Sequence, residues 1–344
     1  NKGGVEVAAG GSFVVDTDKN LYVQSNSGVT GGTLSIGGSM TIGTTNKPTV
    51  FTQSGGGVNT TYAYTYNTAY FGNVTIQNAS RYEQSGGSLQ VGGSGGSADL
   101  TLTGGSRYVL SGGTATITDE LIVSGAGDVY QQSGGVMSVS DIRGRTAGRL
   151  EVTGGDLNIG HRFDLAASAT LDFGSGTATM TVASNAVADL ALGTVSNAGN
   201  TTYTAGVQSE SYFPAGFNPY TAFNNFSSQG LVHTAGTTLV IPGNFVMKAV
   251  TDRTDKMRVE GVLQARDENG TSTNFTINKG GVEVAAGGSF VVDSYYRLYV
   301  QSNSGVTGGT LSIGDGMTIG TTNKPTVFSQ SGGGVNTGTY GTYG

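Results

Sequence analysis

Apolar and polar residues alternate along most of the chain with a period of two. Val5 and Val7 flank Glu6, and the same arrangement recurs at 34–36. This spacing predicts short β-strands with one buried face and one wet face. Helical spacing is not evident over ten or more residues, apart from an undecided Ala-rich run near 183–192. The pattern therefore predicts an all-β protein.

A polar residue followed by two glycines precedes many of these strands. The stretches are VTGGTLSI at 29–36, FTQSGGGV at 51–58, YEQSGGSLQV at 82–91, YVLSGGTATI at 108–117, YQQSGGVMSV at 130–139 and LEVTGGDLNI at 150–159. Glycine adopts positive φ without a Cβ clash, so each pair predicts a sharp turn. We interpret each interval as one coil of a β-solenoid, whose strands pair with the coils before and after it.

A longer repeat joins two parts of the chain. Residues 1–60 return at 278–337, 277 positions later, with seven of the sixty positions changed. Four of the changes are adjacent, at 17–20, which predicts an exposed turn there. The chain is thus predicted to hold one full period of 277 residues and the first 67 residues of the next.

The repeat also predicts how coils continue. The second copy follows the coil-like stretch MRVEGVLQA at 257–265 and NFTI at 274–277, so the first copy is expected to require similar sequence beneath it. We expect the solenoid to continue in both directions, either as tandem units in one polypeptide or as identical subunits docked head to tail.

Residues 194–230 interrupt the alternation with many aromatic residues and almost no charge. We predict solenoid coils over 1–193, an aromatic-rich loop excursion over 194–230, and coils again over 231–344. Tyrosine combines a broad contact area with a hydrogen-bonding tip, which suits lateral contacts and sugar faces. The candidate contact aromatics are Tyr62, Tyr64, Tyr66, Tyr70, Tyr212, Phe213, Phe217, Tyr220, Tyr295 and Tyr296. The alternative is that these rings only cover the side of the solenoid.

Composition excludes several classes of protein. The chain holds 60 Gly among 344 residues without a three-residue period, which excludes collagen. Charged residues are 12% and the net charge is −6. The sequence has no basic cluster, so a nucleic-acid surface is not expected. No apolar run is long enough to predict a membrane span. The chain has no cysteine, which removes thiolate metal sites and Cys nucleophiles.

Some charged residues are of the types that a polysaccharide-cleaving site needs. They are the stretch 251–268, and Asp164 and Asp172 beside His161 and Arg162. Charges within 251–268 alternate in sign, which favours a solvated loop over a site.

Metal ligation has little support in the sequence. The two histidines, His161 and His233, lie in unlike contexts, and SGAGDVY at 124–130 is only a partial match to a calcium-binding nonapeptide. We therefore assign no catalytic, cofactor-binding or metal-binding residue and expect no cofactor.

The stretches SGGSLQV, SGGTATI, TGGTLSI and TGGDLNI resemble the right-handed parallel β-helix of bacterial surface proteins. Examples are autotransporter passengers and filamentous-haemagglutinin-like adhesins. The resemblance covers most of 1–195 and 231–337, and it implies a bacterial extracellular or cell-surface location. The long, clean period departs from the degenerate repeats of those families and favours a fibre.

The sequence thus predicts a parallel β-helix (β-solenoid) that serves as a structural repeat of an extracellular or cell-surface filament. Its expected partner is itself, and no enzymatic activity is expected. The first alternative is a surface adhesin that binds glycans or protein partners. A polysaccharide-degrading enzyme is the second, because parallel β-helices also resemble polysaccharide lyases and hydrolases. Near-identical tandem units favour the fibre, since an active site needs only one copy.

Overall fold

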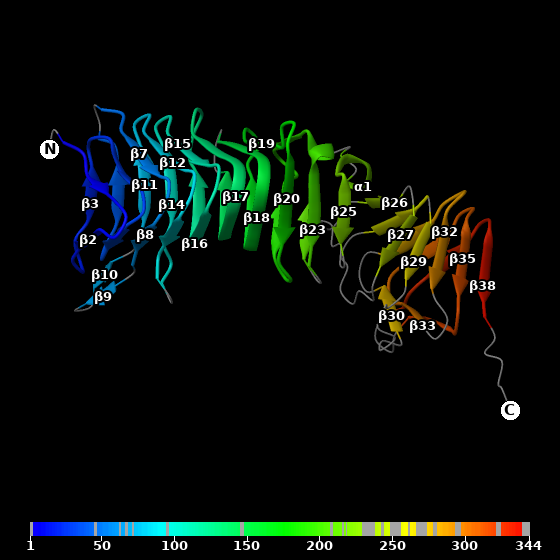
Figure 1. Cartoon of the computed structure of the whole chain (residues 1–344). Coiled ribbons are helices and arrows are strands. Elements are labelled where there is room, and N and C mark those ends of the chain that lie inside the picture. The colour runs from blue at the N-terminus through cyan, green and yellow to red at the C-terminus, as the bar shows by residue number, and fades with distance from the viewer. Residues whose placement is uncertain are drawn as a thin grey trace. The chain divides into compact units, whose positions relative to one another are not determined.

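The computed structural model describes residues 3–338 except 45–46, 62, 66–67, 71, 94–95, 145–147, 207–208, 215–216, 218, 229–237, 242–243, 248–255, 261, 266–273, 278–280, 293–296 and 321–324. Strands account for 59% and helices for 2%, and the strands form parallel sheets that stack as a β-solenoid of about 11 turns. The predicted all-β parallel solenoid is confirmed (Figure 1). In the described part of the chain, no helix has the length and apolarity to cross a bilayer.

The chain divides into two units. Unit 1 comprises residues 1–204 and 213–227, and unit 2 comprises 205–212 and 228–344. In both units each strand pairs in parallel with the corresponding strand of the next coil, so every coil contributes to three faces, which we name A, B and C. Two short helices, η1 (Ala198–Asn200) and α1 (Pro219–Ala222), belong to unit 1.

The faces of unit 1 are built from strands that recur in the same order along the chain. Face A contains β1 (Glu6–Val7), β4 (Ser27–Val29), β7 (Val50–Gln53), β12 (Arg81–Gln84), β15 (Arg107–Leu110), the first part of β17 (Val129–Gly144) and of β18 (Arg149–Leu165), β19 (Thr170–Asp172) and β22 (Thr194–Ser196). Face B contains β2 (Ser12–Val15), β5 (Thr33–Ile36), β8 (Gly57–Thr60), β13 (Ser88–Val91), the first part of β16 (Thr114–Val123), the middle of β17 and β18, β20 (Thr177–Val182), β23 (Thr201–Ala205) and β25 (Asn225–Ser228). Face C contains β3 (Leu21–Val23), β6 (Met40–Ile42), β11 (Val74–Gln77), β14 (Leu100–Thr103), the last parts of β16, β17 and β18, and β21 (Val187–Asp189).

Unit 2 repeats this order. Its face A contains β26 (Thr238–Ile241), β28 (Lys256–Val259), β31 (Val282–Val284), β34 (Ser304–Val306) and β37 (Phe328–Gln330). Its face B contains β27 (Asn244–Met247), β29 (Val262–Ala265), β32 (Ser289–Val292), β35 (Thr310–Ile313) and β38 (Gly334–Thr337), and its face C contains β30 (Asn274–Ile277), β33 (Arg297–Val300) and β36 (Met317–Ile319). Strand β24 (Glu210–Tyr212) also falls within unit 2.

One insertion explains the longest interval between coils. Between β8 and β11 the chain forms an antiparallel hairpin of β9 (Ala63–Thr65) and β10 (Thr68–Tyr70). On either side of the hairpin the parallel register resumes, with Phe51 paired to Tyr82. The extra residues therefore lengthen a corner and leave the stacked strands unchanged.

Inward positions stack in register and form the core of unit 1. On face B, Leu34, Val58 and Leu89 follow one another at the same position in successive coils, and each is at most 2% exposed. Burying each such side chain stabilises the fold by about 1.5–3 kcal/mol. The alternation read from the sequence is thus the alternation between this core and the solvent.

The glycine pairs form tight corners between faces A and B. The second glycine has a positive φ in five of the six stretches, for example +70° at Gly87 and +79° at Gly113, and Gly32 is the exception. A Cβ at Gly113 would collide with the carbonyl oxygen of Gly87 in the preceding coil, and one at Gly87 would collide with that of Gly56. The corner therefore needs glycine both for its backbone conformation and for the close stacking of coils.

A ladder of buried tyrosines and glutamines runs through the interior beneath face A. Phe51, Tyr82, Tyr108 and Tyr130 occupy the same position in four successive coils, with ring centroids 5.0, 5.4 and 5.8 Å apart. Burial raises the pKa of the three tyrosines above its ordinary value, so their hydroxyls remain hydrogen-bond donors.

Each of these hydroxyls donates to a buried glutamine. Tyr82 bonds to Gln53 and Tyr108 bonds to Gln84, in each case in the preceding coil, at 2.6 Å. The coil before Tyr130 carries Leu110 at the glutamine position, so Tyr130 instead donates to Gln132 of its own coil at 2.7 Å.

The amide nitrogen of each glutamine completes this network. The amide nitrogen of Gln84 donates to the backbone carbonyl oxygen of Thr114 in the next coil at 2.8 Å. The amide nitrogen of Gln132 donates to the backbone carbonyl oxygen of Asp156 at 2.9 Å. Gln53 does the same with Ser88 at 2.9 Å. These side chains therefore join one coil to the next where the core is otherwise apolar.

The two copies of the 60-residue sequence fold in the same register. Phe13 pairs with Leu34 in the first copy, and Phe290 pairs with Leu311 in the second. The changed positions that the structure describes include one coupled exchange between neighbouring coils. In the first copy Asn20 accepts a hydrogen bond from the backbone N–H of Ser39 at 2.9 Å. In the second, the aligned residue Arg297 forms an ion pair of 2.9 Å with Asp315, which replaces Gly38.

The tyrosine–glutamine ladder generates a test of stability. Gln84→Leu removes the partner of the Tyr108 hydroxyl and leaves it buried, so we expect a loss of about 1–3 kcal/mol in the free energy of unfolding. The matched control is Gln131→Leu, which changes an outward glutamine and should cost less than about 0.5 kcal/mol. Urea unfolding measures both. Adding Tyr108→Phe to Gln84→Leu should recover part of the loss, and a purely additive double variant would contradict the ladder.

Candidate functional site: a recessed corner of unit 1

The corner between faces B and C changes length in the middle of unit 1. In the first of three successive coils, strand pairing ends at Ile117 and resumes at Glu120. The corresponding residues are Val139 and Asp141 in the second coil, and Ile159 and Arg162 in the third. Two residues therefore form the first and third corners, whereas Ser140 alone forms the second. The shorter corner leaves a recess between its neighbours, and a groove lies along these coils.

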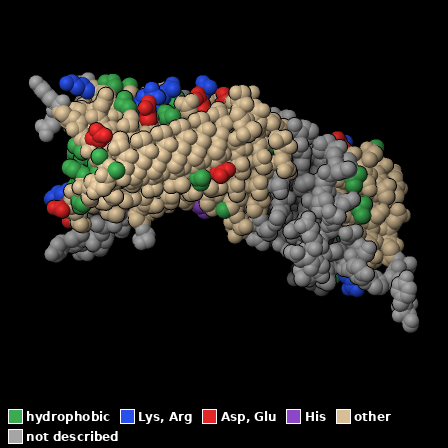
Figure 2. Space-filling view, viewed as in Figure 1, with side chains coloured by type: hydrophobic (Ala, Val, Ile, Leu, Met, Phe, Trp, Pro, Cys, Tyr) green, Lys and Arg blue, Asp and Glu red, His purple; other side chains and the backbone are tan. Residues whose placement is uncertain are grey.

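The groove follows the outward side of face B. It is lined by Thr116, Ile117, Ser138, Val139, Ser140, Asn158, Ile159, Gly160, His161, Thr181 and Ala183. His161 is the only titratable side chain among them. Figure 2 shows that, on the face in view, charged side chains of unit 1 gather mainly along one edge, while polar side chains and backbone cover most of the surface.

A cluster of carboxylates lies beside the groove at this corner. Oxygen atoms of Asp119, Glu120 and Asp141 come within 4.8 Å of one another. Arg143 forms an ion pair of 2.6 Å with Glu120, and the Nδ1 atom of His161 lies 2.8 Å from Asp141. Oxygen ligands of this kind could hold a calcium ion. The guanidinium of Arg143 already supplies positive charge to the cluster.

The His161–Asp141 pair has part of the geometry of a general base. A carboxylate accepts hydrogen bonds, so Nδ1 of His161 donates to Asp141, and in the neutral form of the ring Nε2 is the acceptor. The histidine side chain is 71% exposed. Ser140 lines the same groove, but within the described residues its hydroxyl makes no hydrogen bond to the ring. A serine nucleophile is therefore not assembled there.

The candidate residues near 161–172 fall on different faces. Asp164 lies on face C, where it accepts from Nε of Arg162 at 2.7 and 2.6 Å and raises the pKa of that guanidinium. Asp172 lies on face A, in register with Glu151. The structure thus brings His161 to Asp141, which sequence reasoning had not singled out, and does not bring Asp164 to Asp172.

The charged stretch 251–268 is described only in part, over residues 256–260 and 262–265. Arg258 is described, and it pairs with Glu260 at 2.8 Å and with Glu283 at 3.7 Å. The side chains of Arg258 and Glu260 are 44% and 43% exposed, so the pair is solvated.

The candidate aromatics of residues 194–230, a stretch whose strands β22, β23 and β25 belong to faces A and B, pack partly against one another. Phe213 stacks on Phe217 at 5.4 Å between ring centroids, and both approach Phe223, which is buried. Phe223 and Phe226 also pack on the buried ring of Tyr203. These rings form an apolar cluster within unit 1, next to strands β23 and β25. Tyr212 is half-buried in β24, and the backbone of Tyr220 lies in α1.

The remaining candidate tyrosines lie in or near loops. The backbones of Tyr64 and Tyr70 belong to the β9–β10 hairpin. Tyr62, Tyr66, Tyr295 and Tyr296 lie outside the described residues, as does His233. Their proposed contact role stays a prediction.

Comparison of the chain with protein-family models, with curated proteins and with solved structures finds no match. The functional argument therefore depends on the geometry of the chain itself.

Metal dependence can be tested at the carboxylate cluster. Because Arg143 already neutralises part of its charge, we expect the thermal midpoint of the protein to be the same in excess Ca²⁺ and in EDTA. Arg143→Met leaves three neighbouring carboxylates without the guanidinium, so its midpoint should fall in EDTA and recover in Ca²⁺. A calcium-dependent midpoint for the unchanged protein would contradict this expectation.

Asp172 should make stability depend on pH. Hydrogen bonds from Asn197 (2.8 Å) and from the backbone N–H of Gly174 (2.9 Å), together with Arg149, lower the pKa of Asp172 below its ordinary value of 3.8. The stabilisation is therefore complete above that value and is lost as the pH falls through the lower pKa of the folded state.

Asp172→Asn should remove this contribution while keeping the side-chain shape. Urea unfolding between neutral pH and the acid range is expected to show a shallower loss of stability for the variant than for the unchanged protein. Parallel curves below the ordinary Asp pKa would contradict the assignment.

Proposed function

We propose that the chain is part of a structural β-solenoid filament in which 277-residue units follow one another end to end. The observation that carries this proposal is that strands β31, β32 and β33 of the second copy pair directly with strands β28, β29 and β30, which end the first 277-residue repeat. Leu263 of β29 pairs with Phe290 of β32, and Val259 of β28 pairs with Val284 of β31. The junction between successive 277-residue repeats is therefore the same parallel stacking that joins the coils within unit 2.

Burial at the junction supports the proposal. Phe290 and Leu298 are 0% exposed, because the coil of β28, β29 and β30 lies beneath them. In the first copy the aligned Phe13 is 37% exposed, and its strand β2 pairs only with β5 among the described strands. The same sequence thus has an unsatisfied apolar face wherever a preceding coil is not present.

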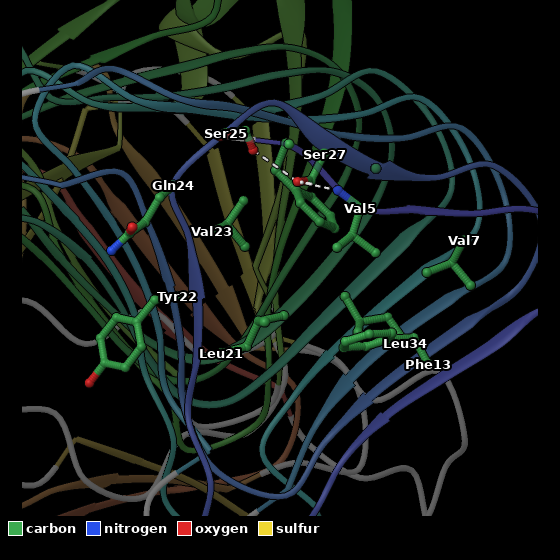
Figure 3. Close-up of a pocket in the computed structure, with 13 residues that line it drawn as sticks. Val5, Val7, Phe13, Leu21, Tyr22, Val23, Gln24, Ser25, Ser27 and Leu34 are labelled. Carbon is green, nitrogen blue, oxygen red and sulfur yellow. Dashed lines mark hydrogen bonds between the residues drawn. The ribbon is translucent and has the colours of Figure 1, made fainter. Parts of the chain in front are cut away.

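This face borders a cavity of about 200 Å³, whose lining residues are drawn in Figure 3. Val5, Val7, Phe13, Leu21 and Leu34 point into it, and Ser27 accepts from the backbone N–H of Val5 at 3.0 Å. In the second copy the coil at this place contributes the buried side chains of Val259, Leu263 and Ile277. This complementarity favours continuation of the solenoid over a separate ligand in the cavity.

In this proposal the protein is non-catalytic and lies at the bacterial cell surface or outside the cell, as the resemblance to surface β-helices implies. Long ladders of parallel hydrogen bonds and a continuous apolar interior would supply mechanical strength along the axis. Near-identical units are useful to such a fibre because each junction reproduces the previous one.

An extension of the full chain tests continuation. Residues 251–277 placed directly before Asn1 reproduce the natural 277–278 junction. We expect amide exchange in β2 to slow to the rate of β32, which has the same sequence SFVV and already pairs on both sides. The matched control is the same extension carrying Leu263→Asp, which places a charge against the aromatic ring and should not protect β2. Continuation is contradicted if the intact extension leaves β2 exchange unchanged or if both extensions protect it equally.

A further inference from the structure

The groove at the recessed corner presents a row of polar groups with a regular spacing. Thr116, Ser138, Asn158 and Thr181 occupy the same outward position in four successive coils. Neighbouring coils are about 4.8 Å apart, so the row runs along the axis of unit 1. Within the described part of the chain these four side chains make no hydrogen bond, although each is half-buried. Their donors and acceptors are available to a ligand.

The groove offers uncharged polar groups together with a small apolar surface. Hydroxyl and amide groups both donate and accept hydrogen bonds. Ala183, which is exposed, and the methyl groups of Thr116 and Thr181 supply the apolar surface of the groove, and Ser140 lies at the shortened corner. Ile117, Val139 and Ile159 border the groove but are at most 4% exposed, so their side chains belong to the core. A matching ligand needs hydroxyl-rich edges, an apolar face, no charge, and enough length to cross several coils. Linear chains of sugar rings have these properties, since each ring carries hydroxyls at its edge and C–H groups on its faces.

We propose that this groove binds a neutral, linear polysaccharide that lies along the solenoid axis. Each sugar makes few contacts in so shallow a groove, and affinity comes from several coils acting together on one polymer. His161 adds one exposed ring at the edge of the groove, fixed by its bond to Asp141. The site does not depend on the filament proposal, because it lies on the side of unit 1 and all its residues come from consecutive coils.

Charge and topology disfavour other polymers. Asp119, Glu120 and Asp141 lie next to the groove, and the chain carries a net charge of −6, so a polyanion would be repelled. An extended peptide could add to a sheet only at a free strand edge. The strands at the groove are paired on both sides, as β17 is with β16 and β18. A neutral polymer that binds through side chains avoids both obstacles.

Affinity electrophoresis of the full chain tests this site. The gels contain hydroxyethylcellulose or dextran as neutral polymers, or polygalacturonate as an anionic one. We expect at least one neutral polymer to slow the protein and polygalacturonate to have no such effect. The double variant Ser138→Ala/Asn158→Ala should weaken the binding about tenfold, as the loss of two hydrogen bonds implies.

The matched control is Ser35→Ala/Asn59→Ala, which removes the same residue types from the same row of face B outside the groove. It should bind as the unchanged protein does. A second variant, Thr116→Val/Thr181→Val, removes hydroxyls with little change of shape and should weaken binding even if the alanine variant unfolds. The site is overturned if no neutral polymer slows the protein, if polygalacturonate slows it most, or if the control loses as much affinity as the groove variants.

Discussion

The structure depends on keeping each coil in register with the next. Each strand in the stack must form backbone hydrogen bonds with the strands of two neighbouring coils. Its inward side chains must also lie over the inward side chains of the preceding coil. Leu34, Val58 and Leu89 satisfy this condition on face B, as do Tyr82 and Tyr108 on face A. Extra residues are tolerated only at corners, and the β9–β10 hairpin enters between two faces without disturbing either. Length changes therefore alter the surface and leave the core unchanged.

Corners and outward positions are consequently where this chain varies. Ser140 shortens one corner and creates the groove, because the coils on both sides have one more residue there. At another corner, the exchange of Asn20 and Gly38 for Arg297 and Asp315 replaces the hydrogen bond from the Ser39 backbone to Asn20 with an ion pair between coils. In both cases neighbouring coils keep their pairing. A solenoid can thus acquire a binding surface without any change to its interior, which makes a structural and an adhesive role compatible in one chain.

Sequence patterns predicted the solenoid and the glycine corners because these depend on short-range periodicity, and the duplicated stretch because its two copies are nearly identical. They did not predict the interior glutamines. Gln84 follows the outward Glu83, yet polarity alone does not distinguish a solvated glutamine from one that bonds to Tyr108 of the next coil. The contact between His161 and Asp141 was also missed, since 20 residues separate them and only the coil register brings them together. The positions of successive glycine pairs could have indicated that register, but not the length of each corner.

The buried ladder explains how a repetitive chain avoids pairing its coils incorrectly. Coils of similar apolar content could stack in several registers with little loss of hydrophobic burial. A shift of one residue, however, would turn Tyr108 outward and leave Gln84 with its amide in the apolar core. Such an unsatisfied group costs about 1–3 kcal/mol, and the cost recurs at each coil that carries the pair. Leu110 interrupts the series, and Tyr130 then bonds within its own coil, so that coil contributes less to register. The hydrogen bonds between buried tyrosines and glutamines therefore select one alignment of the coils among several that the apolar residues alone would permit.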